Sequence, residues 1–228
     1  MTYFTAFLLG LIQGVAEFLP ISSSGHLAIA QNLLGMSQAG SVPEFFDVLL
    51  HLGTLPLFAV LPIRKAVQGL SDNMFFVGGA LIFTGLLLFV CDGVRKGRKT
   101  ERSATWLDAL LVGVGQALAT LPGVSRSGMT ITAGCFVGYE RQFAVRFSFL
   151  LSIPAILGAN ILSIGDAAAA GINTAEMPMY LVGVVTAAVV GYACIRLLKY
   201  VAEKGRFGAF AYYCWAVGVL TLVLQAVK

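Results

Sequence analysis

At residues 13–26 the chain reads QGVAEFLPISSSGH, and at residues 116–130 it reads QALATLPGVSRSGMT. The two stretches align without a gap when the first is moved by 103 positions, from residue 13 to residue 116. Each contains a proline, serines and a glycine in surroundings that are otherwise apolar. We predict that both are breaks between helices and that they meet to form one site.

The two breaks differ at the positions that can carry chemistry. The differing pairs are Glu17 and Thr120, Ser23 and Arg126, and His26 and Met129. A carboxylate and an imidazole therefore come from the first break, and a guanidinium comes from the second. A site built from both breaks combines all three groups.

Composition identifies a helical membrane protein with several spans. Of 228 residues, 58% are hydrophobic and 11% are charged, and the mean hydropathy is +0.86. Soluble domains carry about 25% charged residues. Apolar stretches such as residues 179–198 and 208–227 have the roughly 20 residues needed to cross a membrane. Strict alternation of apolar and polar residues is absent, which argues against an outer-membrane barrel.

The net charge of +4 lies in loops, where membrane topology explains it better than nucleic-acid binding does. Residues 1–19 lack a basic start and a cleavage site, so we expect them to belong to the mature fold. The cysteines lie in or at the ends of apolar segments without a CxxC pair, which predicts small buried residues rather than disulfides or a metal cluster. They are Cys91, Cys135, Cys194 and Cys214.

These patterns predict an all-α polytopic membrane protein that forms one domain, residues 1–228, with internal repeats at about 1–91 and 104–228. In each repeat a helix, a break and a second helix are too short for two spans, so we predict that they enter the membrane and return. The first pair of helices is expected at residues 2–19 and 26–34. The second pair is expected at residues 105–121 and from the end of the 122–128 break to about Gly138. The remaining helices are expected at residues 44–61, 75–90, 143–162, 179–198 and 208–227.

Basic residues mark the cytoplasmic side of a membrane protein. The segments expected there are residues 95–102, Arg141 and residues 199–206. Residues 165–178 lack Lys and Arg and are expected outside. Arg64 and Lys65 depart from this pattern if the helices on both sides of them cross the membrane.

The second break is suited to bind phosphate. Its glycines and serines precede a helix, and the N–H groups and dipole at a helix N-terminus favour an anion. Arg126 adds a planar charged group that matches phosphate oxygens. The simpler alternative is a capped helix whose arginine reaches the lipid headgroups. An ionisable side chain between apolar helices is nevertheless a functional candidate by default, which favours phosphate binding.

The first break supplies reactive groups. His26 titrates near neutral pH, so it can act as a nucleophile or as a general acid or base. Glu17 lies one helical turn after Gln13 and can bind a divalent cation or orient His26. The alternatives are a buried acid paired with a distant arginine and a structural histidine. Glu17 and His26 lie within ten positions of each other, and this clustering favours a functional role for both.

The predicted site contains catalytic and substrate-binding residues. The predicted catalytic residues are His26, Glu17, Arg126 and Ser23. The residues predicted to hold the substrate are Gln13, Ser22, Ser24, Gly25, Ser125, Ser127, Gly128 and Thr130. Glu17 is the predicted metal ligand.

Other polar and aromatic residues are weaker candidates. His51 is expected to be structural, Arg141 to fix the topology, and Arg146 to help attract a phosphorylated substrate. Aromatic residues near the span ends are expected to anchor the protein at the membrane interface. They are Trp106, Tyr180, Tyr212, Tyr213 and Trp215.

The two motifs resemble those of the undecaprenyl-diphosphate phosphatase family, also called the bacitracin-resistance protein family. One family signature is Glu or Gln, three residues, Glu, and then a proline, serines and Gly-His, which matches residues 13–26. The other is Pro-Gly-x-Ser-Arg-Ser-Gly-x-Thr, which matches residues 122–130. The similarity extends over most of the chain, and Gln13 stands where many members have Glu.

The resemblance implies a multi-pass enzyme of the bacterial inner membrane. It would remove the terminal phosphate of undecaprenyl diphosphate, recycling the lipid carrier for peptidoglycan synthesis and giving resistance to bacitracin. It implies an inverted repeat whose re-entrant helices meet near mid-membrane, and it places five residues in the active site. They are Glu17, Ser22, Ser23, His26 and Arg126.

In the mechanism that we expect, His26 attacks the terminal phosphorus, with Ser23 as the alternative nucleophile. Glu17 positions Mg²⁺ or Ca²⁺, or polarises His26 or the attacking water. A homodimer is a further expectation. Family members are usually longer and have another hydrophobic helix between the regions that match Leu61 and Ser71. In this chain only residues 62–70 connect those two regions.

Two other functions fit the sequence. Broken helices and inverted repeats are also typical of transporters, so a flippase or transporter of a phosphorylated lipid or a small anion is the alternative. A structural membrane protein with polar packing at its breaks is the third hypothesis. Phosphate release without a gradient separates the enzyme from both.

Overall fold

The computed structural model describes residues 2–36, 70–154, 176–204 and 206–227. The described residues form helices, with one isolated β-bridge between Lys99 and Tyr139. The helices are α1 (Tyr3–Phe18), α2 (Ser23–Leu33), α5 (Met74–Gly93), α6 (Trp106–Leu118), α7 (Arg126–Phe136), α9 (Met177–Lys204) and α10 (Gly208–Val227), and residues 141–154 are also helical. The all-α prediction is confirmed.

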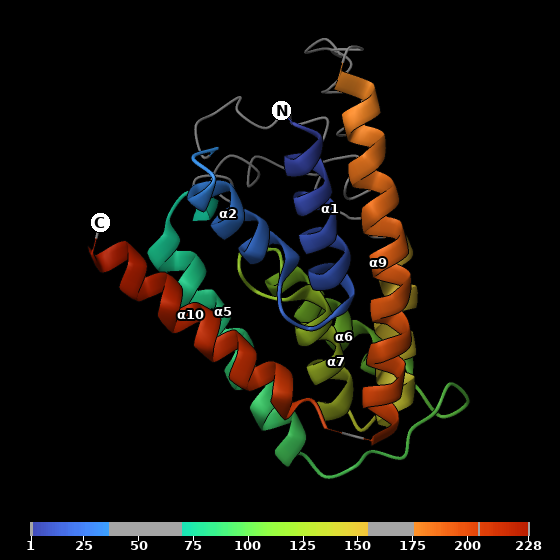
Figure 1. Cartoon of the computed structure of the whole chain (residues 1–228). Helices are drawn as coiled ribbons and strands as arrows, with labels where there is room; N and C mark the ends of the chain where they lie inside the picture. Colours follow the sequence, from blue (N-terminus) through green and yellow to red (C-terminus); the bar gives the residue numbers. More distant parts are fainter. Residues whose placement is uncertain (1, 37–69, 155–175, 205, 228) are drawn as a thin grey trace.

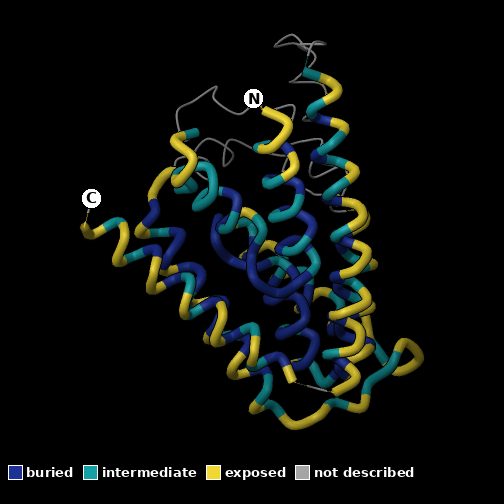
Figure 2. The backbone as a smooth tube through the Cα atoms, in the orientation of Figure 1, coloured by how far each residue is buried: buried dark blue, intermediate teal, exposed yellow. Residues whose placement is uncertain are grey.

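Three of the described helices, α5, α9 and α10, are long and apolar enough to cross a membrane. They correspond to the spans predicted at residues 75–90, 179–198 and 208–227. Helices α1 and α6 are shorter apolar helices, as predicted for segments that end at a break. Figure 2 shows exposed residues along the outer sides of α9 and α10 and buried residues where the breaks lie. Many exposed residues are large and apolar, such as Leu181, Val189 and Leu220, which suits a surface in contact with lipid.

Helices α1 and α9 run side by side in the same direction (Figure 1). Glycines make this approach possible. A Cβ atom at Gly10 would collide with the carbonyl oxygen of Gly183, and one at Gly14 would lie 2.6 Å from the carbonyl oxygen of Ala187. Small residues let helix backbones approach closely in membranes, where packing rather than water exclusion drives association. This contact holds the helix that carries Glu17.

We expect Gly10→Ala to lower the free energy of unfolding by about 1–3 kcal/mol, because the added methyl group overpacks the contact between α1 and α9. Gly113→Ala is the matched control, since Gly113 lies 103 positions later on α6. Apart from its neighbours in α6, none of the described residues lies within 4 Å of a Cβ atom built there, and alanine is the better helix former. Thermal unfolding in detergent measures both variants. A midpoint for Gly10→Ala at or above that of the unmodified protein would contradict this packing.

Helices α5 and α10 cross in opposite directions, and they too approach through glycines. Gly85 faces the indole of Trp215, and Gly218 faces the backbone of Gly78. The indole N–H of Trp215 donates a hydrogen bond to the carbonyl oxygen of Ile82 at 3.1 Å. Trp215 was predicted to be an interfacial anchor, but the structure gives it this specific role between two helices.

The ends of α5 and α10 are joined through Asp92. Its carboxylate accepts hydrogen bonds from the backbone N–H groups of Phe207 and Gly208, at 2.8 and 2.6 Å. Arg141 donates to the same carboxylate at 2.9 Å and is 8% exposed. Arg141 therefore forms a partly buried ion pair that connects three helical segments, in addition to the topological role predicted from its charge.

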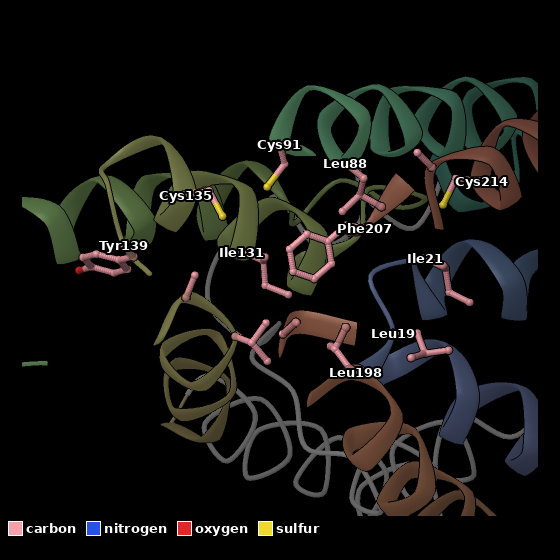
Figure 3. Packing of buried hydrophobic residues seen from close by; sticks show 14 of the residues in the cluster. Leu19, Ile21, Leu88, Cys91, Ile131, Cys135, Tyr139, Leu198, Phe207 and Cys214 are labelled. Atoms are coloured by element: carbon pink, nitrogen blue, oxygen red, sulfur yellow. The ribbon is translucent and has the colours of Figure 1, made fainter. Parts of the chain in front are cut away.

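The main buried cluster joins the first break to α5, α7, α9 and the start of α10. Its labelled members in Figure 3 include Leu19, Ile21, Leu88, Ile131 and Phe207. Leu88, Ile131 and Phe207 are completely buried. Residues from the first break, from α7 and from three spans therefore share one apolar core, which fixes the first break relative to the spans. All four cysteines are buried and free, as predicted.

Some predictions fall on residues outside the described part of the chain. They include the helix at residues 44–61, His51, Arg64 with Lys65, and most of the loop at residues 165–178. The helix predicted at residues 143–162 is observed from residue 141 to residue 154. The repeat boundaries and their inverted relation stay predictions.

Candidate active site

The first break is a sharp reversal between α1 and α2. Leu19 ends α1 in an extended conformation, and Ser22 caps α2 by accepting the N–H of Gly25 on its hydroxyl at 3.3 Å. Ser22 has a φ of 71°, which is unusual for a residue other than glycine. Helix α2 begins at Ser23, earlier than the predicted start at residue 26, because Ser22 acts as the N-cap.

The second break is capped in the same way. Gly123, with a φ of 86°, turns the chain after α6. Ser125 then caps α7 by accepting the N–H of Gly128 at 3.0 Å. The predicted break extended to residue 128, but Arg126 and Gly128 already belong to the first turn of α7. Arg126 therefore sits at a helix N-terminus, where the dipole favours an anion.

The two breaks touch each other, as the sequence predicted. The N–H of Gly123 donates to the hydroxyl of Ser24 at 3.3 Å, and the hydroxyl of Ser127 donates to the carbonyl oxygen of Leu19 at 3.2 Å. A Cβ atom at Gly25 would lie 3.2 Å from the Cα atom of Gly123. A side chain at Gly25 would thus crowd the second break, while a Cβ atom at Gly123 would collide with Ala80 and Val77 of α5.

Glu17 is the centre of the polar cluster between the breaks. One of its carboxylate oxygens pairs with Arg126 from the second break. The other accepts hydrogen bonds from the hydroxyl of Ser23 at 2.5 Å and from the amide of Gln13 at 3.1 Å. The Glu17 side chain is 5% exposed and that of Arg126 is 21% exposed. The arginine thus balances a carboxylate that would otherwise be costly to bury.

His26 lies on α2, one turn after Ser23. Ser23 contacts Glu17, but His26 contacts other residues. Its Nδ1 atom is 2.7 Å from the carbonyl oxygen of Ser22, and its Nε2 atom is 2.9 Å from the hydroxyl of Tyr213 on α10. The two rings lie nearly parallel, at 8°. Of the two roles expected for Glu17, the structure does not show the orienting of His26, because Ser22 and Tyr213 hold the imidazole while Glu17 holds Arg126 and Ser23.

The other predicted substrate-binding residues surround this cluster. The hydroxyls of Ser22 and Ser24 are 3.4 Å apart, and those of Ser125 and Ser127 are 3.3 Å apart. Thr130 is 1% exposed, and its hydroxyl lies 2.6 Å from that of Ser148. Thr130 thus joins α7 to the helical segment at residues 141–154, and its contact with substrate stays a prediction.

Two residues near the breaks were not predicted to have a role there. Tyr213 contacts His26, although the sequence placed it among the interfacial anchors. Thr84 on α5 donates to the carbonyl oxygen of Gly123 at 3.3 Å and accepts the N–H of Ser125 at 3.1 Å. Both are single polar atoms on apolar spans, and no local motif marks either of them. Arg146, in contrast, lies at the surface, 3.8 Å from Glu101.

The residues of the cluster provide a limited set of ligands for a cation. Among the described residues no three His, Cys, Asp or Glu side chains gather as a metal site would require. Glu17 is the carboxylate of the cluster, and the amide of Gln13 is beside it. Mg²⁺ is often held by one or two carboxylates together with substrate phosphates. The donor set therefore fits a cation that binds jointly with a phosphorylated substrate.

Comparison with known proteins shows similarity over the whole chain. The family model for the bacitracin resistance protein BacA matches residues 6–63 and 55–220. The undecaprenyl-diphosphatase of Carboxydothermus hydrogenoformans is 38% identical over 260 aligned positions, covering 99% of this chain and 98% of that protein. Those of Syntrophotalea carbinolica and Halothermothrix orenii are 40% and 36% identical, covering 99% and 100% of this chain and 100% of each relative. The two matched ranges overlap at residues 55–63. This overlap lies beside residues 62–70, the short connection where longer family members are expected to have another helix.

Proposed function

The chain belongs to the bacitracin resistance protein BacA family, and from this premise we propose that its two touching breaks form a phosphatase site. It is a multi-pass bacterial membrane protein that hydrolyses undecaprenyl diphosphate to undecaprenyl phosphate and inorganic phosphate, which returns the lipid carrier to peptidoglycan synthesis. The ion pair between Glu17 and Arg126, which joins the two breaks, is the observation that carries the assignment of the site. The comparisons do not favour the transporter alternative, and a homodimer stays a prediction.

Arg126 is the residue that holds the diphosphate. The guanidinium matches phosphate oxygens through parallel N–H donors, and its place in the first turn of α7 adds the N-terminal dipole. A diphosphate competes with the Glu17 carboxylate for Arg126, because both are anions that need the same donors. Binding therefore moves Arg126 from Glu17 to the diphosphate, and the buried Glu17 carboxylate then needs a new positive partner.

His26 is the nucleophile in this proposal. Its Nε2 atom forms a bond to the terminal phosphorus as the bond from phosphorus to the bridging oxygen breaks, and undecaprenyl phosphate leaves. Water then attacks the phosphohistidine, the N–P bond breaks, and inorganic phosphate is released. Arg126 and the N–H groups at the start of α7 stabilise the charge that develops on the phosphoryl oxygens.

Ser23 is the second candidate nucleophile, on the strength of one contact. Its hydroxyl donates to Glu17 at 2.5 Å, so the carboxylate is placed to take the proton as the oxygen attacks. In this route His26 serves as the acid or base for the leaving group or water. The two routes differ in the covalent intermediate that they form.

Glu17 and Gln13 would hold a divalent cation together with the phosphates of the substrate. The cation would neutralise phosphate charge and polarise the terminal phosphorus. Glu17 is released for this role when Arg126 transfers to the diphosphate. Ser23 keeps the carboxylate oriented through its hydrogen bond.

The purified protein should release phosphate from a C55 or C15 prenyl diphosphate in detergent, without any gradient. Because one carboxylate binds a cation weakly, we expect a chelator to reduce the rate by about tenfold or more, and added Mg²⁺ or Ca²⁺ to restore it. Colorimetric phosphate determination measures both effects. Binding of the diphosphate without any phosphate release would favour transport, and full activity in chelator would remove the cation from the proposal.

A further inference from the structure

Both ring nitrogens of His26 are held by defined partners. The carbonyl oxygen of Ser22, 2.7 Å from Nδ1, can only accept a hydrogen bond, so Nδ1 carries the proton. In the neutral ring the lone pair then lies on Nε2. The hydroxyl of Tyr213, 2.9 Å away, donates to that lone pair. The atom that the mechanism requires as nucleophile or base is therefore covered in the resting protein.

The backbone of Ser22 supports the same arrangement. Its carbonyl oxygen accepts from the backbone N–H of His26, at 3.2 Å, as that of Ser125 does from Met129, and it also accepts from Nδ1, while Ser22 has a φ of 71° and a ψ of 98°. The corresponding Ser125 has an ordinary φ of −72°, and the residue corresponding to His26 is Met129. Unusual backbone conformations are kept at sites where the surroundings and function require them. Here the unusual conformation occurs in the break that carries the imidazole.

We propose that Tyr213 is a positioning residue that covers Nε2 of His26 in the resting site and yields it to the terminal phosphate of the substrate. The proposal rests on the phosphatase function given above. One lone pair cannot accept the Tyr213 proton and attack phosphorus at the same time, so the hydroxyl has to move when substrate binds. Tyr213 is 43% exposed, which leaves room for its ring to turn. After this movement its O–H group can donate to a phosphoryl oxygen.

Tyr213→Phe tests this role, because it removes the hydroxyl and keeps the ring that lies against His26. Without the covering hydroxyl we expect diethyl pyrocarbonate to modify His26 about threefold to tenfold faster, the effect of one hydrogen bond. At the same time kcat for phosphate release should fall by about tenfold, since the hydroxyl that turns to donate to a phosphoryl oxygen is lost, while KM stays within about twofold. Mass spectrometry separates His26 from His51, the other histidine of the chain.

Tyr212→Phe is the matched control, because Tyr212 is on the same helix and contacts Trp215. It should leave both the modification rate and kcat unchanged. Tyr213→Leu, which also lacks the hydroxyl, should change both quantities in the same direction as Tyr213→Phe. Unfolding would also expose His26 and slow the enzyme, so both Tyr213 variants are compared with the unmodified protein by thermal unfolding in detergent, and an unchanged midpoint excludes a general loss of structure.

Two results would overturn the proposal. One is unchanged modification of His26 in both Tyr213 variants, and the other is unchanged kcat in both. Either result leaves the phosphatase function in place as long as the unmodified protein releases phosphate. Failure of the function itself is recognised separately, by the absence of phosphate release from the unmodified protein.

Discussion

Arg126→Ala should lower kcat/KM for phosphate release by about 10³-fold or more. Donors directed at developing charge contribute factors of roughly 10²–10³ each, and arginines at transferring phosphoryl groups contribute about 10³–10⁵. Arg126 is the cation of the polar cluster that the structure describes, and it reaches the first break through Glu17. Phosphate release from a prenyl diphosphate in detergent is the measurement. Activity close to that of the unmodified protein would show that the substrate is held elsewhere.

The alanine variant also leaves the carboxylate of Glu17 buried without its cation, which can cost about 3–5 kcal/mol of stability. Arg126→Lys separates the two effects. Lysine keeps the positive charge beside Glu17 but lacks the planar pair of donors, so this variant should fold and still be strongly impaired. Arg196→Ala is the control for loss of a charge alone, since Arg196 contacts Tyr192 on the exposed side of α9. It should retain full activity.

Much of the fold follows from sequence patterns. Length and apolar composition are sufficient to place α5, α9 and α10, because a helix surrounded by lipid must satisfy its backbone internally. The serines that cap helices indicate where the breaks are, but the residues at which the following helices begin are less well predicted. Ser22 and Ser125 both act as N-caps, so α2 begins before the predicted boundary and α7 begins inside the predicted break. The contact between α1 and α9 depends on glycines whose partners sequence periodicity does not identify.

The meeting of the two breaks was predicted and is confirmed by their contacts, whereas the pairing of their side chains was not fully predicted. The 103-residue offset indicated that Glu17 and Arg126 belong together, and they form an ion pair. The simple alternative for Glu17, an acid paired with a distant arginine, is also what the structure shows, and the pair lies within the predicted site. The partner of His26 was missed because Tyr213 is 187 positions away in the sequence. Only the crossing of α10 beside α2 brings them together, and no motif encodes that crossing.

The loss of activity expected in His26→Ala has a different meaning for each of the two candidate nucleophiles, His26 and Ser23. In the histidine route the phosphoryl group is bound to nitrogen, and in the serine route it is bound to oxygen. Phosphohistidine is labile in acid and stable in base, whereas phosphoserine is stable in acid. Rapid quenching of the enzyme with labelled substrate at the two extremes of pH therefore distinguishes the routes directly.

His26→Ala should abolish phosphate release and also abolish the acid-labile phosphoenzyme. Loss of an attacking group removes a covalent route that the remaining residues cannot replace, and comparable losses in other enzymes reach about 10⁴–10⁶-fold in kcat. Ser23→Ala should retain the acid-labile intermediate and lose about 10- to 100-fold in rate, because Glu17 loses the hydrogen bond that orients it. An acid-stable phosphoenzyme that persists in His26→Ala and disappears in Ser23→Ala would reverse the assignment. It would make Ser23 the nucleophile, with Glu17 as its base.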